Sequence, residues 1–328
     1  MATAFRLLQQ GLFIPKPSLT EKNISDQTGK VHIVTGGYSG VGYELVKILY
    51  SSNATIYSAG RSRDKALESI EAIKAAYPNS NGKLYFLFLD LSDLSTIKKS
   101  ADDFIGKETR LDVLTNNAGI MVPPKGSRNA QGYELQIGTN CLGPFLFTSL
   151  LIPVLKKTAA SSPPGTVRIT WAASSAAELS PKGGVEFELD GVIKTHDDPQ
   201  KDYCQSKAGN VFLAFETARR YGGDGIVSVA WNPGNLQSGL YRHMSQLPKW
   251  VMEKTWLHPP VFGAYTMLYA GWSEDITEES NGAYIIPWGR IGKLRDDIES
   301  GKRRTEESGS GMAGRFWEWC VISTRPYL

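Results

Sequence analysis

Tyr203 and Lys207 are the first pair of residues in this sequence whose types and spacing could do chemistry. Residues four apart lie on one face of a helix, so both side chains would reach a shared ligand. A free phenol has a pKa of about 10 and is a poor acid near neutrality. A nearby ammonium favours the phenolate, which would let Tyr203 exchange a proton with a substrate. Surface packing explains the spacing equally well when the pair is taken alone.

Residues 35–42, Thr-Gly-Gly-Tyr-Ser-Gly-Val-Gly, form a glycine-rich turn between an apolar run and a stretch with helical spacing. Such a turn can bind a pyrophosphate, because helix N–H groups point at it and no Cβ blocks its approach. The G-x-x-x-G-x-G spacing differs from the G-x-G-x-x-G of the general dinucleotide motif. A chance cluster is the competing interpretation, but the position after the first strand favours a dinucleotide site. The predicted cofactor contacts are Gly36, Tyr38, Ser39, Gly40, Val41 and Gly42.

The end of the second predicted strand distinguishes between the two nicotinamide cofactors. An NAD site usually has a carboxylate there that bonds the ribose, whereas an NADP site has an arginine. Residues 58–63, Ser-Ala-Gly-Arg-Ser-Arg, contain two arginines and no acid. Arg61 can bond a 2′-phosphate through two parallel N–H groups. A solvated arginine is the alternative, yet the missing acid and the two arginines together favour NADP(H).

These residues lie within an alternation of predicted strands and helices. Apolar runs predict strands at residues 31–35, 54–58, 83–89, 111–115, 167–172, 226–231 and 282–287, and helical spacing predicts helices at 44–50, 65–76, 92–104, 143–155 and 203–220. Alternation of this kind favours a parallel sheet covered on both faces. With right-handed crossovers this predicts an α/β, doubly wound Rossmann fold with seven parallel strands. No repeat or linker interrupts it, so we expect a single domain over residues 1–328.

Three segments without a clear period, residues 120–133, 178–202 and 239–262, follow the fourth, fifth and sixth predicted strands. Ligands of doubly wound sheets bind beyond the carboxyl ends of the strands, so these segments are expected to wall a substrate pocket. Residues 239–262, rich in Met, Trp and Leu, predict an amphipathic substrate lid over an apolar pocket. Ordinary packing of a loop explains that composition equally well.

The two ends of the chain are predicted to be extensions of the domain. In the N-terminal extension, residues 1–30, we expect a helix that lies on the domain. The C-terminal extension, residues 295–328, contains Phe-Trp-Glu-Trp at 316–319. Capping of the core is the preferred role of this aromatic cluster, with a dimer contact or a pocket contact as alternatives.

Composition excludes several classes of protein. Hydrophobic residues make up 41% and charged residues 21%, as in ordinary globular proteins, and the net charge of +3 is too small to suggest nucleic-acid binding. Three cysteines without a CxxC pair and four scattered histidines predict buried free thiols and no metal site. The longest apolar run, residues 144–155, is too short for a membrane span, and no secretory signal is expected. A cytoplasmic protein, monomer or homodimer, is the expectation.

Further motifs in order along the chain make it resemble the short-chain dehydrogenase/reductase family, especially its retinol-dehydrogenase-like branch and its fungal members. The resemblance covers about residues 30–295, with TGxxxGxG at 35–42 and YxxxK at 203–207. By this resemblance Asn140 completes the catalytic set by holding a water that links Lys207 to solvent. The cofactor contacts that the resemblance adds are Asp90, Leu91, Asn117, Ala118, Gly119, Tyr203, Lys207, Pro233, Gly234, Leu236 and Ser238.

The fifth predicted strand departs from the family pattern, which usually ends in two serines of which the second is catalytic. Residues 168–175 are Arg-Ile-Thr-Trp-Ala-Ala-Ser-Ser. Counting without a gap puts the catalytic position at Ser174, with Ala173 in place of the first serine, whereas counting from the visible pair gives Ser175. A gap within a strand would turn its side chains to the other face, so we predict Ser174.

The resemblance implies an NADPH-dependent reductase that transfers a hydride to a ketone or aldehyde of an apolar or aromatic small molecule, in fungal secondary metabolism. Tyr203 would donate the proton, Ser174 would stabilise charge on the substrate oxygen, and Lys207 would bond the ribose and lower the tyrosine pKa. Alcohol oxidation, a non-redox step such as cyclisation or isomerisation, and a non-catalytic NADP(H)-binding role are the alternatives.

Overall fold

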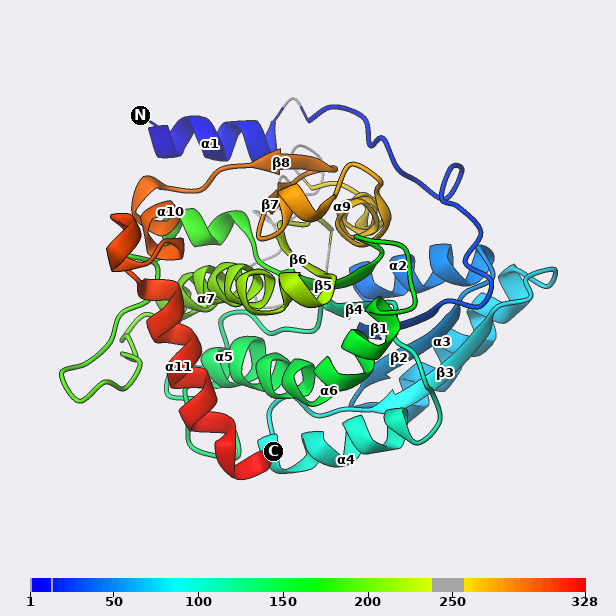
Figure 1. Cartoon of the computed structure of the whole chain (residues 1–328), viewed down its shortest axis with the longest axis horizontal. Coiled ribbons are helices and arrows are strands. Elements are labelled where there is room, and N and C mark those ends of the chain that lie inside the picture. The colour runs from blue at the N-terminus through cyan, green and yellow to red at the C-terminus, as the bar shows by residue number, and fades with distance from the viewer. Residues whose placement is uncertain (1, 13, 238–256) are drawn as a thin grey trace.

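The computed structural model describes residues 2–12, 14–237 and 257–328, and its strands form one twisted sheet (Figure 1). The order across the sheet is β3-β2-β1-β4-β5-β6-β7-β8. Strands β1 to β7 pair in parallel, which confirms the predicted doubly wound α/β fold. The strands are β1 (Val31–Thr35), β2 (Thr55–Gly60), β3 (Lys83–Phe88), β4 (Val113–Asn116), β5 (Val167–Ala172), β6 (Ile226–Trp231), β7 (Tyr284–Ile286) and β8 (Arg290–Gly292).

The described sheet has eight strands, so the predicted number of seven was too low by one. The additional strand, β8, runs antiparallel to β7 at the edge of the sheet, with Ile285 opposite Ile291. Between them the chain reverses through Gly289, whose φ of 98° favours glycine. Three residues in a charged stretch carry too short a pattern to be recognised as a strand.

Helices cover both faces of the sheet and enclose two apolar cores (Figure 1). Adjacent residues of β1 point to opposite faces, so Ile33 belongs to one core and Val34 to the other. The Val34 side is covered by α2 (Gly40–Ser51), α3 (Arg63–Ala76) and α9 (Pro260–Trp272). The Ile33 side is covered by α4 (Leu94–Ile105), α6 (Gly143–Ala159) and α7 (Pro199–Tyr221).

Acidic caps explain where two helices begin. Helix α4 begins at Leu94, two residues after the predicted start, because the Asp93 side chain accepts a hydrogen bond from the Ser95 N–H. Helix α7 begins at Pro199, four residues before the predicted start, where Asp198 accepts from the Gln200 N–H. The earlier start of α7 places Tyr203 and Lys207 inside the helix instead of at its end.

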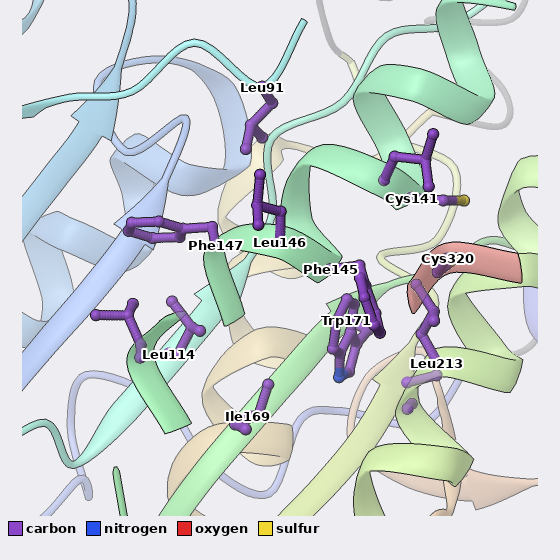
Figure 2. Packing of buried hydrophobic residues seen from close by; sticks show 14 of the residues in the cluster. Leu91, Leu114, Cys141, Phe145, Leu146, Phe147, Ile169, Trp171, Leu213 and Cys320 are labelled. Carbon is purple, nitrogen blue, oxygen red and sulfur yellow. The ribbon is translucent and has the colours of Figure 1, made fainter. Parts of the chain in front are cut away.

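The C-terminal extension caps the core, as the preferred interpretation predicted. After the short helix α10 (Asp296–Lys302), α11 (Met312–Thr324) packs across α7 (Figure 1). Phe316 is fully buried against Gly209 of α7, and Trp317 stacks edge-on against Phe145. The three cysteines are buried and free, as predicted. Figure 2 shows Cys141 and Cys320 among the apolar side chains of this core.

The described chain contains one stretch with the length and hydropathy of a membrane span, Leu135–Ala159, which joins the short helix α5 (Leu135–Ile137) to α6. Of its most apolar part, 83% is buried inside the protein. The stretch is therefore the apolar core helix of the Ile33 side of the sheet.

Candidate active site

Tyr203 and Lys207 lie one turn apart on α7 and line the same pocket at the carboxyl end of β5. The Lys207 Nζ donates a 2.9 Å hydrogen bond to the carbonyl oxygen of Ala172, the last residue of β5. It lies 5.5 Å from the centre of the Tyr203 ring. Both side chains are largely buried, and burial lowers the pKa of Lys207 to about 8. The pocket therefore brings an ammonium and a phenol together where both side chains are largely removed from solvent.

Asn140 stands behind this pair, in a π-helical turn, Gly138–Leu142, that leads into α6. Its side chain forms a double hydrogen bond with the backbone of Ile120, and its Nδ2 donates to Ser206 Oγ at 3.0 Å. A Cβ on Gly119 would lie 3.0 Å from Asn140 Oδ1 and 3.7 Å from Lys207 Nζ. Glycine at 119 thus allows both polar side chains to approach the same stretch of backbone. Turns of this kind are frequent at functional sites.

The two serines after β5 both line the pocket. Ser174 caps a 3₁₀ turn, Ser175–Leu179, by accepting a 3.1 Å hydrogen bond from the Ala176 N–H. Strand β5 pairs with β6 in unbroken register from Val167 to Ala172. That regular pairing is the geometry assumed in counting to Ser174, and the assignment of Ser174 over Ser175 stays a prediction.

The glycine turn after β1 has the shape that a dinucleotide requires. Gly36 and Gly40 have φ of 68° and 55°, in the region that favours glycine. A Cβ on Gly42 would lie 2.5 Å from the Gly36 carbonyl oxygen and 2.7 Å from Asn117 Nδ2. Helix α2 begins at Gly40, and the Ser39 side chain at its N-cap position makes no capping hydrogen bond, so the first N–H groups of the helix face the turn. These features fit the pyrophosphate of a dinucleotide cofactor.

Thr35 joins this turn to the loop that follows β4. Its Oγ1 accepts hydrogen bonds from the N–H groups of Asn117 and Ala118, both at 2.9 Å. Its carbonyl oxygen accepts from Asn117 Nδ2 at 2.8 Å. Sequence reasoning had not assigned Thr35 a role of its own. This role depends on the pairing of β1 with β4, which cannot be predicted from the residues around Thr35 alone.

Arg61 follows β2 and has an exposed side chain. The Tyr38 ring covers the backbone just before it, where a Cβ on Gly60 would overlap the ring, and the Ser62 N–H donates to the Tyr38 hydroxyl at 3.4 Å. Beyond β3, Asp90 Oδ1 accepts from the Ser92 N–H at 2.9 Å, and Leu91 is buried. Arg61 thus follows β2, and Asp90 and Leu91 follow β3, so these residues lie at the carboxyl ends of the two strands on one side of β1 and its glycine turn.

A pocket of about 530 Å³ joins the predicted residues of both halves of the sheet. Apolar residues that sequence reasoning did not name form much of its wall: Leu7, Ile120, Met121, Val122 and Leu179. Positions 120–122 and 179 lie in the segments expected to wall the pocket, whereas Leu7 carries no local signal. The predicted residues that line the pocket are Val41, Asn117, Gly119, Ser174, Tyr203, Lys207, Pro233, Gly234 and Leu236.

The other predicted residues are not part of this pocket wall. Asn140 lies behind it, and those on the cofactor side are Gly36, Tyr38, Ser39, Gly40, Gly42, Arg61, Asp90, Leu91 and Ala118. Ser238 and residues 239–256 of the predicted lid lie outside the described residues, so the lid stays a prediction.

Comparison with known proteins identifies the family. The family model for short chain dehydrogenases matches residues 30–177. A short-chain dehydrogenase/reductase of Phomopsis amygdali is 48% identical over 323 residues, which cover 97% of this chain and 96% of the relative. The short-chain dehydrogenase/reductase pkfC of Emericella nidulans is 47% identical over 315 residues, covering 95% and 98%.

Solved structures show the same fold. An uncharacterized protein from Mycobacterium Paratuberculosis superposes with a TM-score of 0.65 at 26% identity, covering 94% of this chain and 97% of that one. RhlG of Pseudomonas aeruginosa, in a complex with NADP, superposes with a TM-score of 0.61 at 21% identity, covering 79% and 94%. With the full-length similarity to its fungal relatives, the chain belongs to the short-chain dehydrogenase/reductase family.

Proposed function

We propose that this protein is an NADPH-dependent reductase that transfers a hydride to a ketone or aldehyde of an apolar or aromatic small molecule. The observation that carries the proposal is the meeting of Tyr203 and Lys207 in a largely apolar pocket that Val41 of the glycine turn also lines. When bound, the nicotinamide cofactor would supply the hydride. The fungal origin of the relatives of similar length supports a role in fungal secondary metabolism.

Arg61 is the residue that supports NADP(H) over NAD(H). The glycine turn and Asn117 would hold the part that the two cofactors share, and the exposed Arg61 guanidinium would bond the 2′-phosphate. Similar folds do not decide the question, because one is a carbonyl reductase from chicken fatty liver with bound NADPH and another a 3-ketoacyl-(acyl-carrier-protein) reductase complexed with NADH.

The side chains around the pocket suggest how the proton would move. Tyr203 donates its phenolic proton to the carbonyl oxygen as that oxygen gains negative charge. Ser174 donates a hydrogen bond to the same oxygen and stabilises the charge. Lys207 is held by Ala172 with its ammonium beside the phenol, where it favours the phenolate left behind. Asn140 keeps the backbone of Ile120 in place behind them and would bind the water that links Lys207 to solvent.

The size and lining of the pocket support the substrate class. Ile120, Met121, Val122 and Leu179 present apolar surface, which favours a ring or a long carbon skeleton over a sugar. The polar side chains that could orient a substrate are Asn117, Ser174, Ser175, Gln200, Tyr203, Lys207 and Asn235.

Oxidation of NADPH, followed by its absorbance with a panel of ketones and aldehydes, tests the proposal. The variant Tyr203→Phe should bind NADPH normally and lose turnover by about a thousandfold. Tyr221→Phe, at the far end of the same helix, is the matched control and should keep full activity. Full activity in Tyr203→Phe would disprove the proposed mechanism, and tight NADPH binding without oxidation on any carbonyl would favour a non-redox reaction.

The same assay decides between the two serines. Ser174→Ala should lose most activity, while Ser175→Ala should keep most of it. The reverse result would show that the visible serine pair gives the right register.

A further inference from the structure

Helix α1 (Ala2–Gly11) is attached to the segment that follows β5. Arg6 Nε donates to both carboxylate oxygens of Glu178, at 3.2 and 3.0 Å. The Glu178 side chain is completely buried. Glu178 belongs to the 3₁₀ turn that starts directly after Ser174. Since a buried carboxylate that loses its partner is strongly unfavourable, this ion pair fixes α1 against the serine segment.

A second buried contact attaches α1 to the loop that follows β6. Gln10 Oε1 accepts hydrogen bonds from Asn232 Nδ2 at 2.8 Å and from the Tyr284 hydroxyl at 3.1 Å. Asn232 Oδ1 in turn accepts from the Gly234 N–H at 3.0 Å. Helix α1 is therefore connected through a chain of hydrogen bonds to the loop that lines the pocket beside Tyr203.

Leu7 lies between the two attachments and faces the pocket, which it lines. Gln10, three residues later, lies on the same side of the helix and is 3% exposed. Leu8 and Phe5 point away from the protein, with 52% and 69% of their surface exposed. The partly buried ion pair of Arg6 and the buried hydrogen bonds of Gln10 therefore attach α1 on either side of Leu7.

We infer that α1 is the outer wall of the substrate pocket and that Leu7 limits the size of the substrate that the pocket admits. The two attachments hold the helix backbone in one place, so a larger side chain at position 7 must occupy pocket volume and a smaller one must release it. The inference deepens the proposed function, because the identity of the substrate as a carbonyl compound rests on that function.

The test compares Leu7→Trp with Leu8→Trp, the same substitution on the inner and the outer side of α1. The rate of NADPH oxidation is measured with carbonyl compounds graded from a short aliphatic aldehyde to aromatic ketones of several rings. Leu7→Trp should lower kcat/KM for the largest ketones by about tenfold or more and leave the short aldehyde within about twofold. Leu7→Ala should shift the preference toward the largest compounds, and Leu8→Trp should change nothing.

Binding of the apolar dye anilinonaphthalenesulfonate, followed by its fluorescence, tests the same wall without turnover. Leu7→Trp should weaken dye binding relative to both the wild type and Leu8→Trp. Equal behaviour of the two tryptophan variants would overturn the inference while leaving the proposed function intact. If the wild-type protein reduces no carbonyl compound, the proposed function fails, and the dye measurement alone decides whether Leu7 forms the wall.

Discussion

Two buried cations occupy opposite ends of strand β5, and the protein satisfies them in different ways. Lys207, 6% exposed, donates to one carbonyl oxygen among the described residues, that of Ala172 at the carboxyl end of the strand. Arg168, 5% exposed, lies near the start of the strand. It donates to four carbonyl oxygens, those of Gly165, Ala270, Ser273 and Ile276. Burial lowers the pKa of Arg168 to about 10 and that of Lys207 to about 8.

The difference distinguishes a charge that joins two elements of the fold from one that faces the pocket. Ala270 and Ser273 lie at the carboxyl end of α9, where the helix dipole and unpaired carbonyl groups favour a cation. Arg168 therefore joins α9 to the centre of the sheet. Lys207 lines a pocket and keeps N–H groups for a ligand there. Similar burial thus serves stability at one end of the strand and, in the proposed function, chemistry at the other.

Replacement of Lys207 should have the largest effect of any change at these two sites, and the effect should be on turnover. Lys207→Met should lower kcat by about a thousandfold, because the ammonium that favours the phenolate of Tyr203 is lost. Its free energy of unfolding at neutral pH should not fall, since methionine fills a similar volume without a buried charge. Steady-state kinetics and urea denaturation measure the two quantities. A loss of stability with turnover retained would show that Lys207 is a structural cation after all.

Replacement of Arg168 should do the opposite. Arg168→Met leaves buried carbonyl oxygens without donors and should lower the free energy of unfolding by about 3 kcal/mol or more. The folded fraction should keep its kcat within about twofold, because Arg168 is remote from the pocket. Urea denaturation is the measurement, with the exposed Arg325→Met as the matched control that should remain as stable as the wild type. A stable but inactive Arg168→Met would contradict the comparison.

The two cations also show which contacts can be predicted from the sequence and which cannot. Tyr203 lies four residues before Lys207 on the same helix, so a short pattern points to the pair, and the other motifs along the chain support it. The Arg168 acceptors at Ala270, Ser273 and Ile276 lie 102, 105 and 108 residues away along the chain. No local pattern predicts contacts of that range, so Arg168 served only as a starting point for counting to the serine.

The same limit explains the rest of the fold and of the site. Strands β5 and β6 were predicted with their observed bounds because both are fully buried runs in which most residues are apolar. Strand β8 exists only by pairing with β7, and Leu7 reaches the pocket only because Arg6 and Gln10 attach α1 to two distant loops. The contacts that local sequence patterns did not predict are therefore those between segments far apart in the chain, such as the contacts of α1 with the segments after β5 and β6.

The pH dependence of stability sharpens the comparison at Lys207. Its pKa falls from 10.5 in the unfolded chain to about 8 in the folded protein. Between these values the unfolded chain binds a proton that the folded protein does not, so the contribution of Lys207 to the free energy of unfolding rises with pH. Below pH 8 the buried charge costs up to about 3 kcal/mol.

Measured stabilities of the wild type and Lys207→Met should reflect this cost. The variant should be the more stable at pH 7, and its advantage should shrink as the pH rises toward 10. Taking the difference between the two proteins cancels the other groups that titrate in this range. A constant difference over the range would mean that Lys207 keeps an ordinary pKa in the folded state.

Arg61 extends the comparison to an exposed cation, where the smallest effect is expected. A guanidinium that is already solvated adds little to stability, so Arg61→Ala should unfold at the same urea concentration as the wild type. Arg61 should contribute to binding only when the cofactor carries a 2′-phosphate. The variant Arg61→Ala should therefore raise the KM for NADPH by about tenfold and leave the KM for NADH unchanged. Arg63→Ala, two residues along, is the matched control. An equal rise in KM for both cofactors, or a larger effect in the control, would remove Arg61 from the cofactor site.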